Sequence, residues 1–227
     1  RRGDSSTVYF MASHTVPVID IFAGPGGLSE GFTRQGAERH RSANFQIRLS
    51  IEKDSYAAAT LWLRSFYRHA TGLTRSTAYG GYLRRELNLD ELRSSDPDAA
   101  ESADAEIWQT ELGKNDRDEV REKITKVLDN SEKWVLIGGP PCQAYSLVGR
   151  SRLLPVIGEK KFAEDERHYL YLEYLRILAD HAPTAFVFEN VRGITSARLN
   201  GKSVFSQIRA DLEDPAGAFD DGDVGDL

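Results

Sequence analysis

The stretch that decides the fold class of this chain is Val18-Ile19-Asp20-Ile21-Phe22-Ala23-Gly24-Pro25-Gly26-Gly27-Leu28-Ser29-Glu30-Gly31-Phe32. A mostly apolar run leads into a glycine-rich turn, and the residues after it place Leu28 and Phe32 on one face of an expected helix. Strand, glycine turn and helix in this order are typical of a nucleotide-binding α/β sheet, because glycine lets the backbone approach a ligand closely. The turn is not the dinucleotide fingerprint, since Ser29 stands where that pattern needs a third glycine.

A second informative stretch, Gly138-Gly139-Pro140-Pro141-Cys142-Gln143, contains the only cysteine of the chain. It follows the apolar run 134–137, which predicts a short buried strand. The two prolines restrict the backbone, so the thiol is expected on a stiff segment at the edge of a sheet. Stiffness suits a nucleophile that must meet its target atom. The alternative is a small buried apolar residue, the usual role of a lone free cysteine.

Two further apolar runs each deliver an acid at the end of a predicted strand. Glu189 and Asn190 follow the run 185–188, and Glu52 follows the run 49–51. Open parallel sheets bind ligands at the carboxyl ends of their strands, and an acid at the position of Glu52 is near the place where a ribose would be bound. The alternative for both acids is an ordinary solvated loop carboxylate.

Together these segments resemble the cytosine-5 DNA methyltransferases. Residues 22–27 with Gly31 and Phe32 are similar to the cofactor loop of that family, residues 139–146 to its nucleophile loop, and Glu189-Asn190-Val191 to its third signature. The resemblance covers roughly residues 17–60 and 133–196. It implies a Rossmann-like, mostly parallel methyltransferase sheet with helices on both faces. It also implies S-adenosylmethionine as methyl donor, a cytosine flipped out of double-stranded DNA, and a place in restriction-modification.

The resemblance also implies roles for individual residues. Cys142 would add to carbon 6 of cytosine so that carbon 5 accepts the methyl group, Glu189 would bind or protonate ring nitrogen 3, and Asn190 would brace the nucleophile loop. Pro141 and Gln143 flank the nucleophile. Phe22 would pack on adenine and Glu52 would bind the ribose. The remaining cofactor-binding positions are Asp20, Ala23, Gly24, Gly26, Gly27, Leu28, Pro140 and, at the methionine end, Leu170.

The chain departs from the family pattern in three respects. Lys53 stands where an aromatic residue often stacks on adenine. No third acidic motif, which would contact the adenine amino group, can be placed between Asp54 and Lys133. The 37 residues after Asn190 are too few for a further arginine-bearing strand, a target-recognition domain and a closing segment. We therefore expect the amino-terminal portion of a methyltransferase, with an unpaired sheet edge open to association.

The predicted organisation is a flexible leader (1–15), an incomplete catalytic domain (16–210) containing an insertion at about 71–117, and an acidic tail (211–227), without a target-recognition domain. Within the insertion we expect a loop over 72–81 and a short helix over 83–92. An amphipathic helix is expected from Asp116, leading into the strand before Cys142.

Charge and composition limit the class of protein. The net charge of −6 combines −8 over residues 90–122, −7 over 211–226 and +9 on the remainder, and such a basic remainder is compatible with phosphate binding. One cysteine excludes a disulfide framework and suits a cytoplasmic protein, associated with the nucleoid if bacterial. The five histidines lack metal-ligand spacing, so no metal is expected, and no apolar stretch predicts a membrane span.

Two other functions fit the same segments. A tRNA cytosine-5 methyltransferase would share this loop architecture, and a catalytically idle binding fragment would suit the short chain.

The polar, basic segment 146–167 is expected to close over DNA, as a mobile phosphate-binding loop would, or else to be a plain surface loop.

Overall fold

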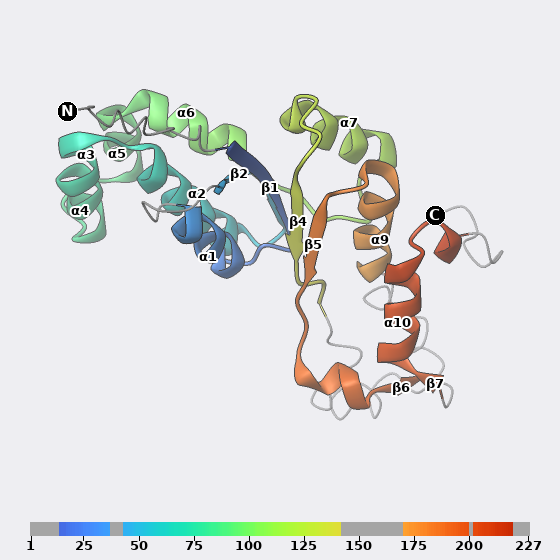
Figure 1. The fold of residues 1–227 in the computed structure, drawn as a ribbon. Coiled ribbons are helices and arrows are strands. Elements are labelled where there is room, and N and C mark those ends of the chain that lie inside the picture. The colour runs from blue at the N-terminus through green and yellow to red at the C-terminus, as the bar shows by residue number, and fades with distance from the viewer. Residues whose placement is uncertain (1–13, 37–42, 142–169, 200–201, 220–227) are drawn as a thin grey trace, which may run out of the picture.

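The computed structural model describes residues 14–36, 43–141, 170–199 and 202–219 (Figure 1). Their centre is a five-stranded sheet with the order β3-β2-β1-β4-β5. All four pairings in this sheet are parallel, as the predicted α/β, Rossmann-like class requires. The strands are β1 (His14–Ile21), β2 (Ala43–Glu52), β3 (Ile107–Gln109), β4 (Val135–Gly138) and β5 (Ala185–Phe188).

The strand order reverses at β1, because the chain adds β2 and β3 on one side of it and β4 and β5 on the other. In open parallel sheets, a ligand-binding crevice forms outside the carboxyl ends of the strands at such a reversal. The glycine turn after β1 therefore stands where the fold itself provides a binding site.

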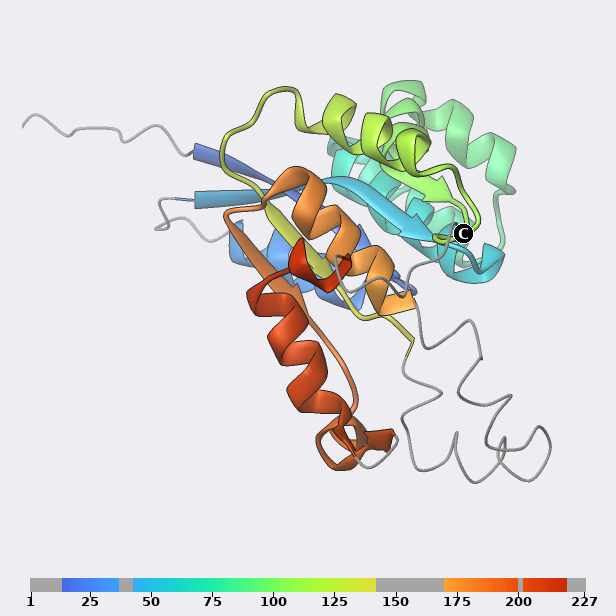
Figure 2. The same ribbon diagram turned by 90° about the vertical axis from the view of Figure 1, so that its right-hand side faces the viewer.

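Helices cover both faces of the sheet, as Figures 1 and 2 show. Leu28 and Phe32 of α1 pack on one face, beside Val18 and Ile137. On the other face lie α7 and α9, with Ile124 and other residues of these helices buried against the sheet. The larger helices are α1 (Gly27–Gly36), α2 (Ser55–His69), α7 (Arg117–Leu128), α9 (Leu170–His181) and α10 (Val204–Glu213). The predicted sandwich of helices around a parallel sheet is confirmed.

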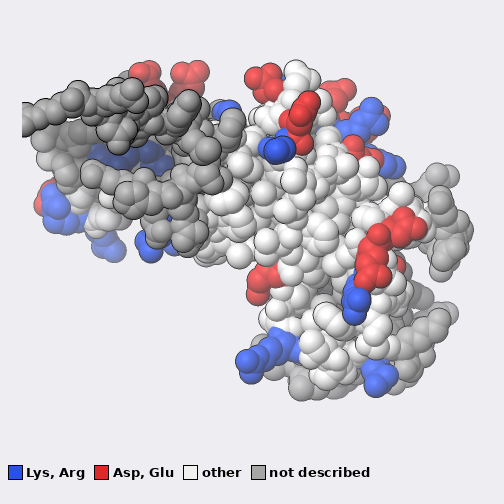
Figure 3. All heavy atoms as spheres, viewed as in Figure 1, with Lys and Arg blue, Asp and Glu red and all other residues white. Residues whose placement is uncertain are grey.

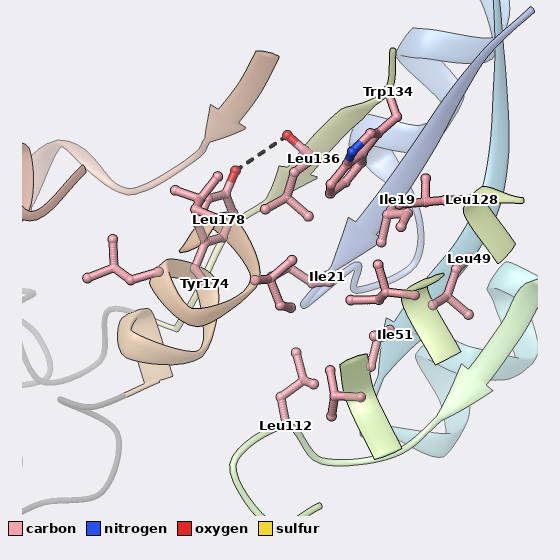
Figure 4. Close-up of a cluster of buried hydrophobic side chains, with 14 residues drawn as sticks. Ile19, Ile21, Leu49, Ile51, Leu112, Leu128, Trp134, Leu136, Tyr174 and Leu178 are labelled. Carbon is pink, nitrogen blue, oxygen red and sulfur yellow. Dashed lines mark hydrogen bonds between the residues drawn. The ribbon is translucent and has the colours of Figure 1, made fainter. Parts of the chain in front are cut away.

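The main hydrophobic core lies between the sheet and helices α7 and α9 (Figure 4). Tyr174 of α9 is fully buried there, and its ring meets the ring of Phe188 edge-on at a centroid distance of 5.1 Å. The Tyr174 hydroxyl donates to the carbonyl of Val187 at 3.0 Å, and burial raises the pKa of this phenol, so it stays a neutral donor. Helix α9 is thereby fixed to the backbone of β5.

A helical layer packs on α2 beyond the β3 end of the sheet. It comprises α3 (Gly72–Ser76), α4 (Ala78–Leu83), α5 (Leu89–Ser95) and α6 (Pro97–Glu106). The prediction of a loop over 72–81 was wrong, because Tyr79 and Tyr82 pack against the cluster around Phe66 and this contact outweighs the weak helix propensity of the local sequence. The short helix expected over 83–92 begins later, after Asn88, whose side chain forms a capping box with Glu91.

The chain after β5 forms a lobe beyond the carboxyl end of that strand. We call it the carboxyl lobe: η2 (Arg192–Ser196), β6 (Arg198–Leu199), β7 (Lys202–Ser203), α10 and η3 (Gly217–Phe219). Its small core consists of Ile194, Ala197, Val204 and Ile208, joined to Tyr171 and Phe188. The lobe is therefore anchored to both α9 and β5.

Strand β5 is the last strand of the described sheet on the side away from β3, and it is poorly covered. Phe186 is 41% exposed and Val187 37% exposed, although both belong to an apolar strand. A search of the described helices finds none long and apolar enough to cross a bilayer.

Candidate active site at the carboxyl edge of the sheet

The glycine turn after β1 is pressed against helix α2. Gly24 and Gly26 have φ angles of +54° and +86°, in the region that favours glycine. A Cβ at Gly26 would lie 2.7 Å from Cδ2 of Leu61, and the Gly26 carbonyl accepts a hydrogen bond from the Arg64 guanidinium at 3.1 Å. A Cβ at Gly27 would meet no atom within 4 Å. Helix α2 thus holds the turn in place at Gly26, while the space beside Gly27 is open.

Glu52 ties this turn to the end of β2. One carboxylate oxygen accepts from the backbone N–H of Gly24 at 2.8 Å, and the other accepts from the N–H of Asp54 at 2.8 Å. Each carboxylate oxygen has further lone pairs, so Glu52 keeps acceptor capacity for the two hydroxyls of a ribose. The carboxylate is held in place before any ligand arrives.

A pocket of about 460 Å³, counted with its open mouth, lies across the ends of β1 to β4. Four residues predicted from the sequence line it: Phe22, Glu52, Pro141 and Leu170. The other lining residues are Ile51, Lys53, Thr110, Glu111, Leu112 and Gly139. Residues that lie far apart in the sequence therefore meet in one cavity.

The end of β3 supplies an acid that the sequence reading had failed to find. Glu111 lines the pocket, and its carboxylate accepts from Lys114 at 3.0 Å and pairs with Lys53 at 3.4 Å. The Lys114 ammonium, followed by that of Lys53, holds the pKa of Glu111 below its usual range. No acid of this region was singled out from the sequence, whereas the structure puts Glu111 in the wall of the pocket. Strand β3 has only three residues and follows an acidic helix directly, so it leaves no alternating pattern; the pair Ile107-Trp108 was the available signal.

Asp20, on β1 beneath the turn, is completely buried. The Ser29 hydroxyl donates to one carboxylate oxygen, while the other oxygen and the hydroxyl of Ser50, its register neighbour on β2, have no partner among the described residues. Burial raises the pKa of Asp20 to about 7. Asp20 thus joins β1 to the first turn of α1 but does not line the pocket.

Glu189 lies directly against the segment that leads to Cys142. A Cβ at Gly139 would lie 2.7 Å from a carboxylate oxygen of Glu189, so no larger residue fits there without displacing it. The side-chain amide of Asn190 donates to the carbonyl of Pro140 at 3.3 Å. Asn190 therefore contacts the start of the predicted nucleophile loop. Cys142 and Gln143 lie outside the described residues.

The remaining predicted residues take supporting positions. Pro140 is buried at the end of β4, Ala23 donates its N–H to the Ile51 carbonyl at 3.1 Å, and Leu28 packs against the sheet. In the part of the chain that the structure describes, no cluster of three or more metal-ligating side chains occurs. The described polar side chains at this edge include the carboxylates of Glu52, Glu111 and Glu189 and the amide of Asn190.

Residues 96–215, more than half of the chain, match the C-5 cytosine-specific DNA methylase family. The chain belongs to this family. The methylase match includes β3, β4, β5 and the carboxyl lobe as far as residue 215, and therefore the acids Glu111 and Glu189.

Named relatives of this methylase are type II methyltransferases. It is 35% identical over 213 residues to M.Bpa9945I of Bacillus paralicheniformis, covering 86% of this chain and 44% of the relative. It is 36% identical over 103 residues to M.FnuDI of Fusobacterium nucleatum, covering 44% of this chain and 27% of the relative. It is 28% identical over 197 residues to M.BspRI of Lysinibacillus sphaericus, covering 86% of this chain and 37% of the relative. The chain spans less than half the length of these relatives.

Proposed function

We propose that the protein to which this chain belongs transfers a methyl group from S-adenosylmethionine to carbon 5 of cytosine in double-stranded DNA. The observation that carries the proposal is the position of Gly139, which lines the pocket and lies against the Glu189 carboxylate. A cofactor in the pocket and a cytosine held by Glu189 would be neighbours, as direct methyl transfer demands. The family and the type II methyltransferase relatives support DNA as the substrate.

The pocket residues fit the proposed cofactor. Phe22, Ile51 and Leu112 offer apolar surface to a purine, and Glu52 keeps acceptor capacity for the ribose hydroxyls. Glu111, which lines the pocket, would accept from the adenine amino group, and Leu170 would line the methionine end. The turn Ala23 to Leu28 leaves room for the ligand, because the space beside the Gly27 Cα is open. S-adenosylmethionine, when bound, supplies an electrophilic methyl group.

In the proposed reaction the Cys142 thiolate adds to carbon 6 of a flipped-out cytosine. Carbon 5 then takes the methyl group, which leaves S-adenosylhomocysteine, and transfer of the carbon 5 proton to water releases the thiolate from carbon 6. Glu189 protonates ring nitrogen 3 as negative charge develops in the ring, which stabilises the transition state more than the ground state. The covalent adduct divides one difficult step into two easier ones. Asn190 positions the loop through its hydrogen bond to Pro140, and Pro141 and Gln143 flank the thiol.

A trapping experiment tests the covalent step. A form of the protein long enough to match its relatives from end to end is expected to form a denaturant-resistant adduct with 5-fluorocytosine DNA. The Cys142→Ser variant is expected to form none. An equal yield of adduct from the serine variant would refute the assignment of the nucleophile. Methyl transfer to tRNA but not to duplex DNA would favour the RNA enzyme instead.

The chain by itself is a separate question, because it spans less than half of its named relatives. We infer that these 227 residues alone bind the cofactor weakly and methylate no DNA, which is the idle-fragment alternative. Incubation with tritiated S-adenosylmethionine and mixed-sequence duplexes is expected to give no incorporation. Robust incorporation that is lost in Cys142→Ala would contradict this inference.

A further inference from the structure

The carboxyl lobe begins with a stretch that contains bases and no acids. Residues 190–210 include four basic residues, and the first acid after Glu189 is Asp211. The four are Arg192, Arg198, Lys202 and Arg209. This run of 21 residues carries a charge of +4, which is part of the +9 that lies outside the two acidic stretches. It directly follows the proposed catalytic pair Glu189-Asn190.

Two of these arginines have no carboxylate partner in the described part of the chain. Arg192 and Arg198 are exposed, and neither forms an ion pair with any other residue within the described ranges. Other arginines of the chain are engaged: Arg117 pairs with Asp180 at 2.6 Å, and Arg209 with Glu213 at 2.9 Å. Arg192 and Arg198 therefore present free guanidinium groups, which suit bidentate binding of phosphate.

Both arginines extend from a rigid platform. They flank the turn that buries Ile194 and Ala197 in the core of the lobe. The Thr195 hydroxyl donates to the Arg192 carbonyl at 2.9 Å, and the Val204 N–H donates to the Ala197 carbonyl at 3.1 Å. Because the backbone is held by these contacts, little conformational entropy remains to be lost there when a ligand binds.

The lobe lies apart from the acidic part of the molecule. In Figures 1 and 2 the turn η2 and the hairpin β6–β7 occupy the lower end, while α6 and α7 lie at the upper end. Figure 3 shows Lys and Arg side chains on that lower end, acidic and basic side chains at the top, and a further group of acidic side chains on the right, above the lower end. The η2 and β6–β7 end of the lobe contains basic residues and no acids, so a polyanion would be attracted to that end rather than to the acidic helices α6 and α7.

We propose that Arg192 and Arg198 bind phosphates of the DNA backbone close to the target cytosine. The inference rests on the proposed function, because Glu189 marks where the flipped base would lie. Contacts to phosphate fix the register of a protein on DNA without reading its sequence. The two arginines would hold the strand beside the active site, while sequence recognition would belong to other groups.

The test is the salt dependence of DNA binding by the full chain. Anisotropy of a fluorescein-labelled mixed-sequence duplex would be titrated at several KCl concentrations between ~50 and ~200 mM, a range over which phosphate contacts change affinity strongly. In the double variant Arg192→Gln/Arg198→Gln, the slope of log K against log salt is expected to become shallower by about 1.8, about 0.9 for each lost phosphate contact. Affinity at ~100 mM salt should fall at least tenfold on the same basis.

Matched variants separate local contacts from net charge. Arg84→Gln/Arg85→Gln removes the same charge from exposed positions of the helical layer and is expected to leave the slope nearly unchanged. Arg192→Lys/Arg198→Lys should keep most of the slope. The proposal is overturned if the control pair lowers the slope equally, if the glutamine pair leaves it unchanged, or if the unaltered chain does not bind duplex DNA.

Two further readouts complete the test. If only tRNA binding, and not duplex binding, responds to the glutamine pair, DNA is the wrong partner. Calorimetric titration with S-adenosylhomocysteine reports on the pocket alone, and the glutamine pair is expected to leave that affinity unchanged. If the chain binds S-adenosylhomocysteine but the glutamine pair does not change the salt slope of DNA binding, phosphate binding by Arg192 and Arg198 is refuted. The proposed function is then unaffected.

Discussion

Adding one methyl group to each glycine of the turn after β1 should give three different results. At Gly27 a Cβ meets nothing, so Gly27→Ala should change the free energy of unfolding by no more than about 0.5 kcal/mol. At Gly24 the space is also open but φ is +54°, and the left-handed conformation costs roughly 1–2 kcal/mol, partly offset by lower entropy of the unfolded chain. We expect Gly24→Ala to destabilise by about 1 kcal/mol.

At Gly26 two costs combine. Its φ is +86°, and a Cβ would lie 2.7 Å from Leu61, which has 2% of its surface exposed and little freedom to move. Overpacking of this kind costs roughly 1–3 kcal/mol beyond the backbone strain, so Gly26→Ala should destabilise by about 2–4 kcal/mol. In a chain of this size that lowers Tm by roughly 5–15 °C.

Urea unfolding followed by circular dichroism would rank the three variants, and calorimetry with S-adenosylhomocysteine would report on the open side of the turn. Gly27→Ala should lose cofactor affinity while keeping its stability, if the ligand occupies the space in front of the turn. Equal destabilisation by the Gly24 and Gly26 variants would refute the contact with Leu61. Unchanged cofactor binding in Gly27→Ala would show that the ligand lies elsewhere.

Three other predictions concern the acids. Because burial raises the folded-state pKa of Asp20 to about 7 from the ordinary 3.8, the folded protein binds the extra proton, so stability should fall as pH rises from about 4 to about 7. Asp20→Asn should flatten this decline, which urea unfolding across that range measures; parallel curves would contradict it. In a form of the protein as long as its relatives, Glu189→Gln should lower turnover by roughly 10²–10⁴-fold without a comparable loss of cofactor affinity. Steady-state rates measure the turnover and calorimetry measures the affinity. Glu111→Gln should weaken S-adenosylhomocysteine binding by roughly tenfold or more, the value of a hydrogen bond to a charged group. Lys114→Gln, which removes a partner of the same carboxylate outside the pocket lining, should change calorimetric affinity far less; equal losses would point to the ion pairs instead.

The sequence was informative where a buried strand ends in an unusual residue. The runs before Phe22, Glu52 and Gly139 are apolar because the sheet is covered on both faces there, and these runs and the one before Glu189 all end at the edge where the pocket lies. Periodicity and turn chemistry are local signals, and here they coincide with the tertiary arrangement. The fold class and most of the pocket could therefore be predicted.

The parts that were missed depend on contacts between distant segments. Strand β3 is defined by its pairing with β2, since Ser50 pairs with Ile107, and three residues are too few to show a pattern. Helix α4 exists because Tyr79 and Tyr82 pack on α2, although its own sequence contains two adjacent glycines. No reading of the local sequence could have found Glu111 without first placing β3.

The central position of β1 affects how the chain is made. Val18 pairs with Ile47 on one side but with Val135 on the other, so the second partner is synthesised more than a hundred residues later. At about 5–20 residues per second, ribosomes need roughly 6–25 s to cover that interval. During that time one edge of an apolar strand has no native partner, and pairings between residues so far apart in sequence are slow to form. We expect the nascent chain to need protection by chaperones until β4 has emerged.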